Sequence, residues 1–223
     1  MATHLDLEEQ EQLDALKAFW NQYGNLITWL LVAALSVYAA FNGWQWYQRD
    51  QALKSSAMYE QLERSALLGD VDQTQRVFED MKARYPRTVY TQQGALLTAK
   101  TQAAKGQLDA ARATLAWVAE HAGEADYKTI ARLRLAGLLL DQKKYDEALK
   151  QLDAGPVAKE FEALAADRRG DILLAQGKGD DAKAAYAKAW QAMAEGVDYR
   201  RLIEAKLASL GAAPAVPASG AVR

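Results

Sequence analysis

The chain has 223 residues, no cysteine and a formal net charge of -2 at pH 7. The lack of cysteine excludes disulfides, thiolate metal sites and cysteine nucleophiles. The near-neutral charge, with no run of five basic residues, argues against a nucleic-acid partner. The charge is uneven, because residues 1–23 hold five acidic residues and one lysine.

An uncharged apolar run predicts a membrane anchor near the amino terminus. No charged residue lies between Lys17 and Arg49. A helix over residues 26–47 would span about 33 Å at about 1.5 Å per residue, which matches the hydrocarbon thickness of a bilayer. Aromatic side chains that favour the two membrane interfaces flank the run: Trp20, Tyr23, Trp44, Trp46 and Tyr47. We therefore predict an acidic segment over residues 1–23 and a transmembrane helix over residues 24–48.

A cleaved signal peptide and a buried core helix are the alternatives to this anchor. A signal peptide begins with a short basic region, whereas the segment before the run is acidic and helix-patterned. A core helix rarely stays uncharged for about 30 residues. The acidic segment and the length of the uncharged run therefore both favour a retained anchor. Orientation stays open, because the charges near the run, Lys17 against Arg49, Lys54 and Arg64, weakly favour a cytoplasmic carboxyl side.

A periodic pattern of small residues predicts antiparallel helix pairs after the anchor. Ala148 and Ala182 lie 34 residues apart, the period of a tetratricopeptide repeat, and Thr74 and Ala111 precede them at steps of 37 residues. Small residues let two helices cross closely, and larger neighbours one turn later fill the flanks. These larger neighbours are Phe78, Leu115, Leu152 and Tyr186.

The predicted repeat domain covers residues 49–210. The turns inside its helix pairs carry Gly69, Gly106, Lys143 and Gly177, and Pro86 closes the first pair. We expect pairs over about residues 50–86, 88–122, 126–155 and 158–195, and a capping helix over about residues 198–210. Residues 211–223 include two prolines and few large apolar residues, so we expect a disordered tail.

Residue types that carry chemistry are sparse. His4 and His121 lie far apart in sequence, with no acidic partner at metal-ligand spacing. The stretch from Gly177 to Asp180 (GKGD) follows no predicted strand and lacks the ending of a phosphate-binding loop. We therefore expect no catalytic residue, no cofactor and no metal, and a protein that is not an enzyme.

The remaining candidate site is the concave surface that the first helices of stacked pairs form. Such grooves bind extended or helical peptide segments. Repeat register places eight residues there: Tyr59, Glu63, Leu96, Lys100, Leu133, Arg134, Gly137 and Asp141. The alternative for each is structural, with Leu96 and Leu133 in the core and the charged side chains merely solvated.

Four segments carry a family resemblance over about residues 10–210. They are EQLDALKAFWNQYGN before the apolar run, GWQWYQRDQALKSSAMYEQL after it, LRLAGLLLDQKKYDEALKQLD, and ADRRGDILLAQGKGDDAKAAYAKAW, the most specific of the four. In this order they resemble the YfgM-type ancillary subunits of the bacterial Sec translocon. The resemblance implies an all-α fold, with a single N-terminal transmembrane helix followed by a tetratricopeptide-like solenoid of helical hairpins.

The resemblance also implies a location and partners. It implies a single-pass protein of the bacterial inner membrane, with its amino terminus in the cytoplasm and its repeats in the periplasm. The implied partners are the bilayer, the SecYEG translocon, a PpiD-type periplasmic chaperone and newly secreted, unfolded polypeptides. The implied role is transfer of newly translocated proteins to periplasmic chaperones. The residues alone leave open a structural envelope or division-linked scaffold as the alternative.

Overall fold

The computed structural model describes residues 7–212, and all regular secondary structure in that range is helical. This confirms the predicted all-α class. Two compact units share the range, one ending at Leu53 and the other beginning at Lys54. His4 lies outside the described residues, as does the predicted tail apart from Gly211 and Ala212.

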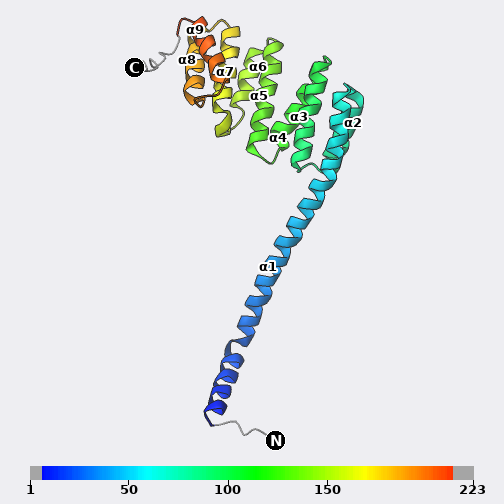
Figure 1. The fold of residues 1–223 in the computed structure, drawn as a ribbon, viewed down its shortest axis with the longest axis vertical. Helices are drawn as coiled ribbons and strands as arrows, with labels where there is room; N and C mark the ends of the chain where they lie inside the picture. The colour runs from blue at the N-terminus through cyan, green and yellow to red at the C-terminus, as the bar shows by residue number, and fades with distance from the viewer. Residues whose placement is uncertain (1–6, 213–223) are drawn as a thin grey trace, which may run out of the picture. The chain divides into compact units, whose positions relative to one another are not determined.

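The first helix, α1, begins at Leu7 and ends at Leu67 (Figure 1). It contains the whole predicted anchor and also the first helix expected of the repeats. The reason is visible in the sequence, since this stretch has no proline and only two glycines, Gly24 and Gly43. The boundary expected between residues 48 and 49 is therefore not a break in the helix.

Polar side chains in the apolar part of α1 bond to their own helix. The hydroxyl of Thr28 donates to the carbonyl of Gly24 at 2.7 Å, and that of Ser36 donates to the carbonyl of Val32 at 2.7 Å. The side-chain amide of Asn42 donates to the carbonyl of Tyr38 at 2.9 Å. These bonds give each of the three side chains a partner within the helix, which lowers the cost of placing it in an apolar environment.

Within residues 7–212, α1 is the helix long and apolar enough to cross a membrane, judged by length and composition. Only 6% of its most apolar window is buried inside the structure. Large apolar side chains along this part are exposed, among them Trp29, Leu30 and Leu35. The core helix of a soluble domain would bury such side chains, so the exposure favours the anchor over the core-helix alternative.

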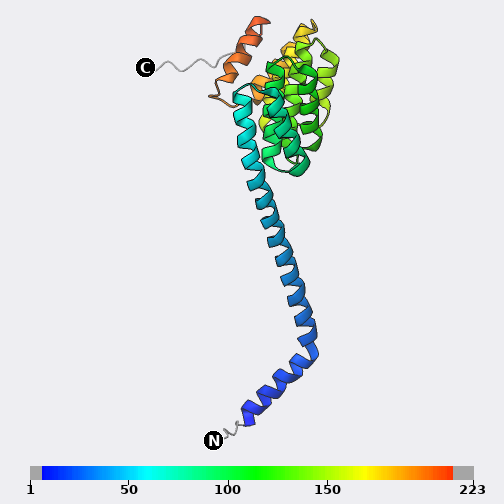
Figure 2. The same cartoon turned by 90° about the vertical axis from the view of Figure 1, so that its right-hand side faces the viewer.

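The second unit continues from the end of α1 as a series of paired helices. In chain order these are α2 (Val71–Arg84), α3 (Val89–Ala104), α4 (Leu108–His121), α5 (Ala125–Asp141), α6 (Tyr145–Asp153), a 3-10 turn (Lys159–Phe161), α7 (Glu162–Ala175), α8 (Gly179–Ala192) and α9 (Tyr199–Ser209). Consecutive helices from α2 to α9 pack side by side (Figure 1, Figure 2). The fold is a stack of helical hairpins, as the repeat pattern predicts.

The turns inside the pairs have the predicted backbone conformation. Each has a residue with positive φ: 69° at Gly69, 78° at Gly106, 59° at Lys143 and 78° at Gly177. Glycine adopts this left-handed conformation without steric cost, whereas Lys143 carries a Cβ atom that disfavours it.

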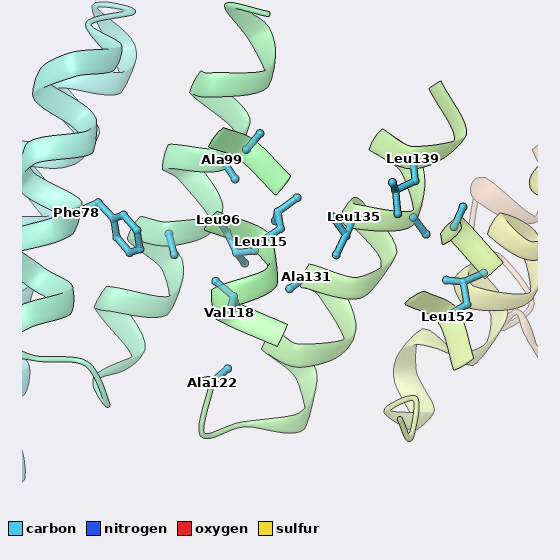
Figure 3. Close-up of a cluster of buried hydrophobic side chains, with 14 of the residues drawn as sticks. Phe78, Leu96, Ala99, Leu115, Val118, Ala122, Ala131, Leu135, Leu139 and Leu152 are labelled. Carbon is cyan, nitrogen blue, oxygen red and sulfur yellow. The ribbon is translucent and has the colours of Figure 1, made fainter. Parts of the chain in front are cut away.

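The small residues predicted at the helix crossings are fully buried. Thr74, Ala111, Ala148 and Ala182 are each 0% exposed. The larger residues one turn later are also buried, and Phe78, Leu115 and Leu152 lie in one apolar cluster (Figure 3). The sequence period therefore identifies which residues of each repeat are packed in the core.

An ionic cluster fixes α9 to the fourth pair. Asp167 is buried and accepts hydrogen bonds from Lys206 Nζ at 2.8 Å and from the Tyr199 hydroxyl at 2.7 Å. Lys206 also donates to Asp171 at 2.6 Å, and the Tyr186 hydroxyl donates to Asp171 at 2.9 Å. Burial and these hydrogen bonds raise the pKa of both tyrosines, so their hydroxyls remain protonated donors.

Candidate peptide-binding surface

A pocket of about 390 Å³ lies between the first helices of the second, third and fourth pairs. Polar side chains on its wall come from all three helices: Lys100 from α3, Arg134 and Asp141 from α5, and Arg168 from α7. Ala99, Ala103, Leu115 and Leu138 form the apolar part. The pocket therefore combines an apolar wall with several charged groups.

Four of the eight predicted groove residues line this pocket: Lys100, Arg134, Gly137 and Asp141. Leu96 does not, because its side chain is only 7% exposed and belongs to the core (Figure 3). Its carbonyl still contributes, accepting a hydrogen bond from Arg134 Nη1 at 3.1 Å. Leu133 is half-buried against the same core. Peptide contact by any of these residues stays a prediction.

Tyr59 and Glu63 lie near the end of α1, and neither lines the pocket. Tyr59 is half-buried, with its ring centroid 6.0 Å from that of Tyr90. Burial raises the pKa of Tyr59, and the nearby charge of Glu63 adds to the effect. Their place in a peptide groove is therefore a prediction separate from the pocket.

The positive charge of the pocket is only partly balanced. Arg168 Nη1 lies 3.7 Å from the carboxylate of Asp171. Among residues 7–212, no carboxylate is within ion-pairing distance of Lys100 or Arg134. Burial lowers the pKa of Arg134, because partial removal from water disfavours the charged guanidinium. Arg134 is nevertheless an exposed residue, so water also solvates its guanidinium.

Sequence reasoning missed Arg168, although a signal for it existed. Arg168 follows Arg134 by 34 residues, and Arg134 follows Lys100 by 34 residues. All three residues, the cation row, line one pocket, but Lys100 lies three residues off the register of the other two, because the step from the second pair to the third is 37 residues. Extending the period to the fourth pair would have included Arg168. Gly137 lies beside it, since a Cβ atom there would lie 3.6 Å from Arg168 Cζ, an ordinary contact distance.

A second pocket, of about 330 Å³, lies between α2 and α4 and was not predicted. Lys82 Nζ lies 5.8 Å from the ring centroids of both Phe78 and Trp117. The polar side chains that line this pocket bond to one another. Thr114 donates to Gln102 at 3.0 Å, and Gln102 donates to Gln75. Nothing in this pocket therefore calls for a ligand.

No metal centre is formed by the part of the chain that the structure describes. In residues 7–212, no group of three or more histidine, cysteine, aspartate or glutamate side chains could hold a metal ion. His121 stacks on Trp117 at 5.4 Å between ring centroids. Gly177, which belongs to the GKGD stretch, lies in the turn between α7 and α8. This stretch is a repeat turn.

The predicted interface residues are exposed on α1. Exposed fractions run from 42% for Tyr23 to 70% for Trp46. The other three interface residues, Trp20, Trp44 and Tyr47, have exposed fractions between these two values. Rings also lie near one another within the helix, with centroids 6.0 Å apart for Trp44 and Tyr47. Contact with the membrane interfaces stays a prediction for all five.

Stacked helical hairpins preceded by an exposed apolar helix define a membrane-anchored protein of the tetratricopeptide-repeat class. A family model described as a tetratricopeptide repeat-like domain matches residues 17–212. The chain is 31% identical over 211 residues to the ancillary SecYEG translocon subunit of Neisseria gonorrhoeae, covering 94% of this chain and 100% of that protein.

Proteins with the same description from two other bacteria are also similar. The Escherichia coli protein is 25% identical, over 80% of this chain and 85% of its own length. The Haemophilus influenzae protein is 25% identical, over 83% of this chain and 90% of its own length. No solved structure matches the chain significantly. The chain belongs to the family of ancillary SecYEG translocon subunits, which confirms the resemblance seen in its sequence.

Proposed function

We propose that the protein is a membrane-tethered interaction subunit of the SecYEG translocon, which helps transfer newly translocated proteins to periplasmic chaperones. The observation that carries this proposal is the 31% identity over the whole length of the Neisseria gonorrhoeae translocon subunit. That alignment covers 94% of this chain, so it takes in the apolar helix as well as the repeats. A fold of this class acts by binding other proteins, not by catalysis.

The proposed topology places the amino terminus in the cytoplasm and the repeats in the periplasm of the inner membrane. Arg49, Lys54 and Arg64 weakly favour the opposite orientation. Charge near a span loses influence when a long folded domain follows it, and here the second unit extends from Lys54 through the last described residues. The proposal therefore follows the family relationship.

The proposed partners are SecYEG, a PpiD-type periplasmic chaperone and unfolded or newly secreted polypeptides. The repeat groove, with its pocket on α3, α5 and α7, supports the binding of peptide segments. Anchoring confines this groove to the membrane surface, which raises its effective concentration toward emerging chains. Weak binding to each segment is then sufficient, and a weakly bound chain can be passed on.

The test is recovery of partners from native membranes. The tagged full-length chain is crosslinked in cells that contain both SecYEG and a PpiD-type chaperone, and partners are identified by mass spectrometry. We expect both to be recovered. A matched chain whose residues 24–48 are replaced by an unrelated transmembrane helix shows whether the anchor or the repeats make the contact.

Failure to recover either partner would contradict the proposal. Recovery of cell-wall or division proteins alone would instead favour the alternative function, a structural scaffold of the envelope.

A further inference from the structure

We infer that residues 10–23, the first part of α1 whose side chains the structure describes, lie along the membrane surface as an amphipathic helix. The apolar face of this helix is buried among the lipid headgroups, so the lipid bilayer is its partner. This contact goes beyond the proposed function. It does not depend on which side of the membrane the amino terminus occupies.

An exposed apolar stripe runs along this part of α1. Successive residues of a helix are rotated by about 100°, so five large apolar side chains fall within about 120° of one face. Their exposed fractions run from 41% at Leu13 to 62% at Leu16. The other three members of the stripe are Phe19, Trp20 and Tyr23. A continuous exposed stripe of this kind marks a contact surface.

Polar side chains occupy the opposite face of the same segment. By the same rotation, Glu11, Asp14 and Asn21 project away from the stripe. Lys17 Nζ lies 3.3 Å from Asp14 Oδ1, and both side chains are exposed, so this pair remains in water when the stripe is buried. A helix with one apolar and one polar face lies in the membrane interface instead of crossing the bilayer.

The stripe is continuous with the predicted transmembrane helix. It ends at Tyr23, and the span predicted over residues 24–48 begins at the next residue. Aromatic side chains such as Trp20 and Tyr23 favour the interface itself. Figure 2 shows α1 bent in its amino-terminal part, so its first turns run at an angle to the rest of the helix. The bilayer surface is therefore the nearest apolar environment for the stripe.

The pattern fits lipid better than a protein partner. A coiled coil with a second copy needs the apolar repeat over at least three to four heptads, and residues 10–23 cover about two. A basic partner surface would need several acidic residues to pair with. Residues 10–23 contain only two, Glu11 and Asp14, and Asp14 already pairs with Lys17.

The test is spin labelling of the full-length chain, which has no native cysteine to react with the label. Three variants place the label on the stripe: Leu13→Cys, Leu16→Cys and Phe19→Cys. Three matched controls place it on the polar face: Glu11→Cys, Asp14→Cys and Asn21→Cys. All six positions are exposed, so the substitutions retain the fold. Each labelled chain is placed singly in a phosphatidylcholine nanodisc, so lipid is the partner available to the stripe.

Electron paramagnetic resonance then measures how often the label collides with oxygen, which concentrates in lipid, and with a water-soluble nickel complex. We expect the ratio of oxygen to nickel collisions to be about three- to tenfold higher on the stripe than on the polar face. Leu16→Cys and Asp14→Cys give the sharpest comparison. These positions are two residues apart, so distance along the chain does not explain a difference between them.

A ratio that is the same at all six positions would overturn the inference. So would a ratio that changes steadily along the chain without a helical period, because the segment would then project straight from the membrane. A periodic pattern that appears only after a second copy or SecYEG is added would also overturn it, since a protein would then cover the stripe. None of these outcomes contradicts the translocon role, which is tested separately by recovery of SecYEG.

Discussion

Lys143 occupies a turn position at which the other three helix pairs have glycine. Its φ of 59° lies in the left-handed region, where the Cβ atom is disfavoured. We predict that Lys143→Gly raises the free energy of unfolding by about 0.5–1 kcal/mol, measured by denaturation of the full chain in detergent.

The neighbouring Lys144 provides the control for this prediction. It is exposed as well, but its φ is -90°, which any residue adopts. Lys144→Gly should give no gain in stability, because it relieves no strain. A loss of stability in Lys143→Gly would contradict the assignment of strain to this turn.

Gly170 of α7 and Tyr186 of α8 lie at a close contact between the two helices of the fourth pair. A Cβ atom on Gly170 would lie 2.4 Å from Tyr186 Cε1, and the ring of Tyr186 is only 1% exposed. Because a buried ring has no space to retreat into, we predict that Gly170→Ala lowers the free energy of unfolding by about 1–3 kcal/mol. Thermal denaturation provides the measurement.

At Gly137, the same substitution should raise the free energy of unfolding instead of lowering it. A Cβ atom there meets Arg168 Cζ at 3.6 Å, an ordinary contact, and alanine favours the helix by about 0.5–1 kcal/mol. Equal changes in the free energy of unfolding for Gly170→Ala and Gly137→Ala would contradict the claim that Tyr186 leaves no room for a Cβ atom at Gly170.

Packing at the residue scale could be predicted because the sequence repeats it. Thr74, Ala111, Ala148 and Ala182 share one role, and each occurrence supports the others. The ionic cluster of Asp167, Lys206 and their tyrosine partners could not be predicted in this way. It joins α7 to α9, a helix outside the repeat, across 39 residues of sequence. A single contact without a period leaves no pattern to detect.

At the scale of elements, the attachment of α9 depends on this ionic cluster. Lys206→Met would leave the buried Asp167 without its cation, and we predict a loss of about 3 kcal/mol in the stability of α9. Hydrogen exchange of the amides of α9 should accelerate, while exchange in α3 and α5 stays slow. The control Arg201→Met removes an exposed charge from the same helix and should leave exchange unchanged.

The anchor function of α1 depends on its uncharged apolar part. Leu35→Lys places a charge near the middle of the predicted span at a cost of about 3 kcal/mol, comparable with the favourable insertion energy of its apolar residues. We predict that a larger fraction of the protein is released from membranes by alkaline carbonate. Leu68→Lys, at a site that is 85% exposed after α1, should stay fully membrane-bound. Equal retention of both variants would contradict the assigned span.

The helix boundaries illustrate what local sequence can and cannot specify. Turns with glycine mark the ends of helices within the repeats, and those ends lie where they were predicted. Between Trp44 and Tyr59 there is neither glycine nor proline, so no local signal separates the anchor from the first repeat helix. The structure accordingly has one helix through this region.

At the scale of the whole molecule, the family relationship supplies what residue patterns do not. The anchor and the repeats follow from apolar length and period, and the pocket joins four residues predicted from register. Orientation in the membrane does not follow, because the charges flanking the span are few and the domain after it is long. Transfer of translocated proteins requires the repeats to lie on the periplasmic side.

The most direct test of this account is therefore a topology reporter fused after Leu210, the residue that follows α9. We predict that an enzyme active only in the periplasm is active in this fusion, while a reporter that fluoresces only in the cytoplasm is dark. The reverse pair of results would place the repeats in the cytoplasm and contradict both the proposed topology and the role at the translocon exit.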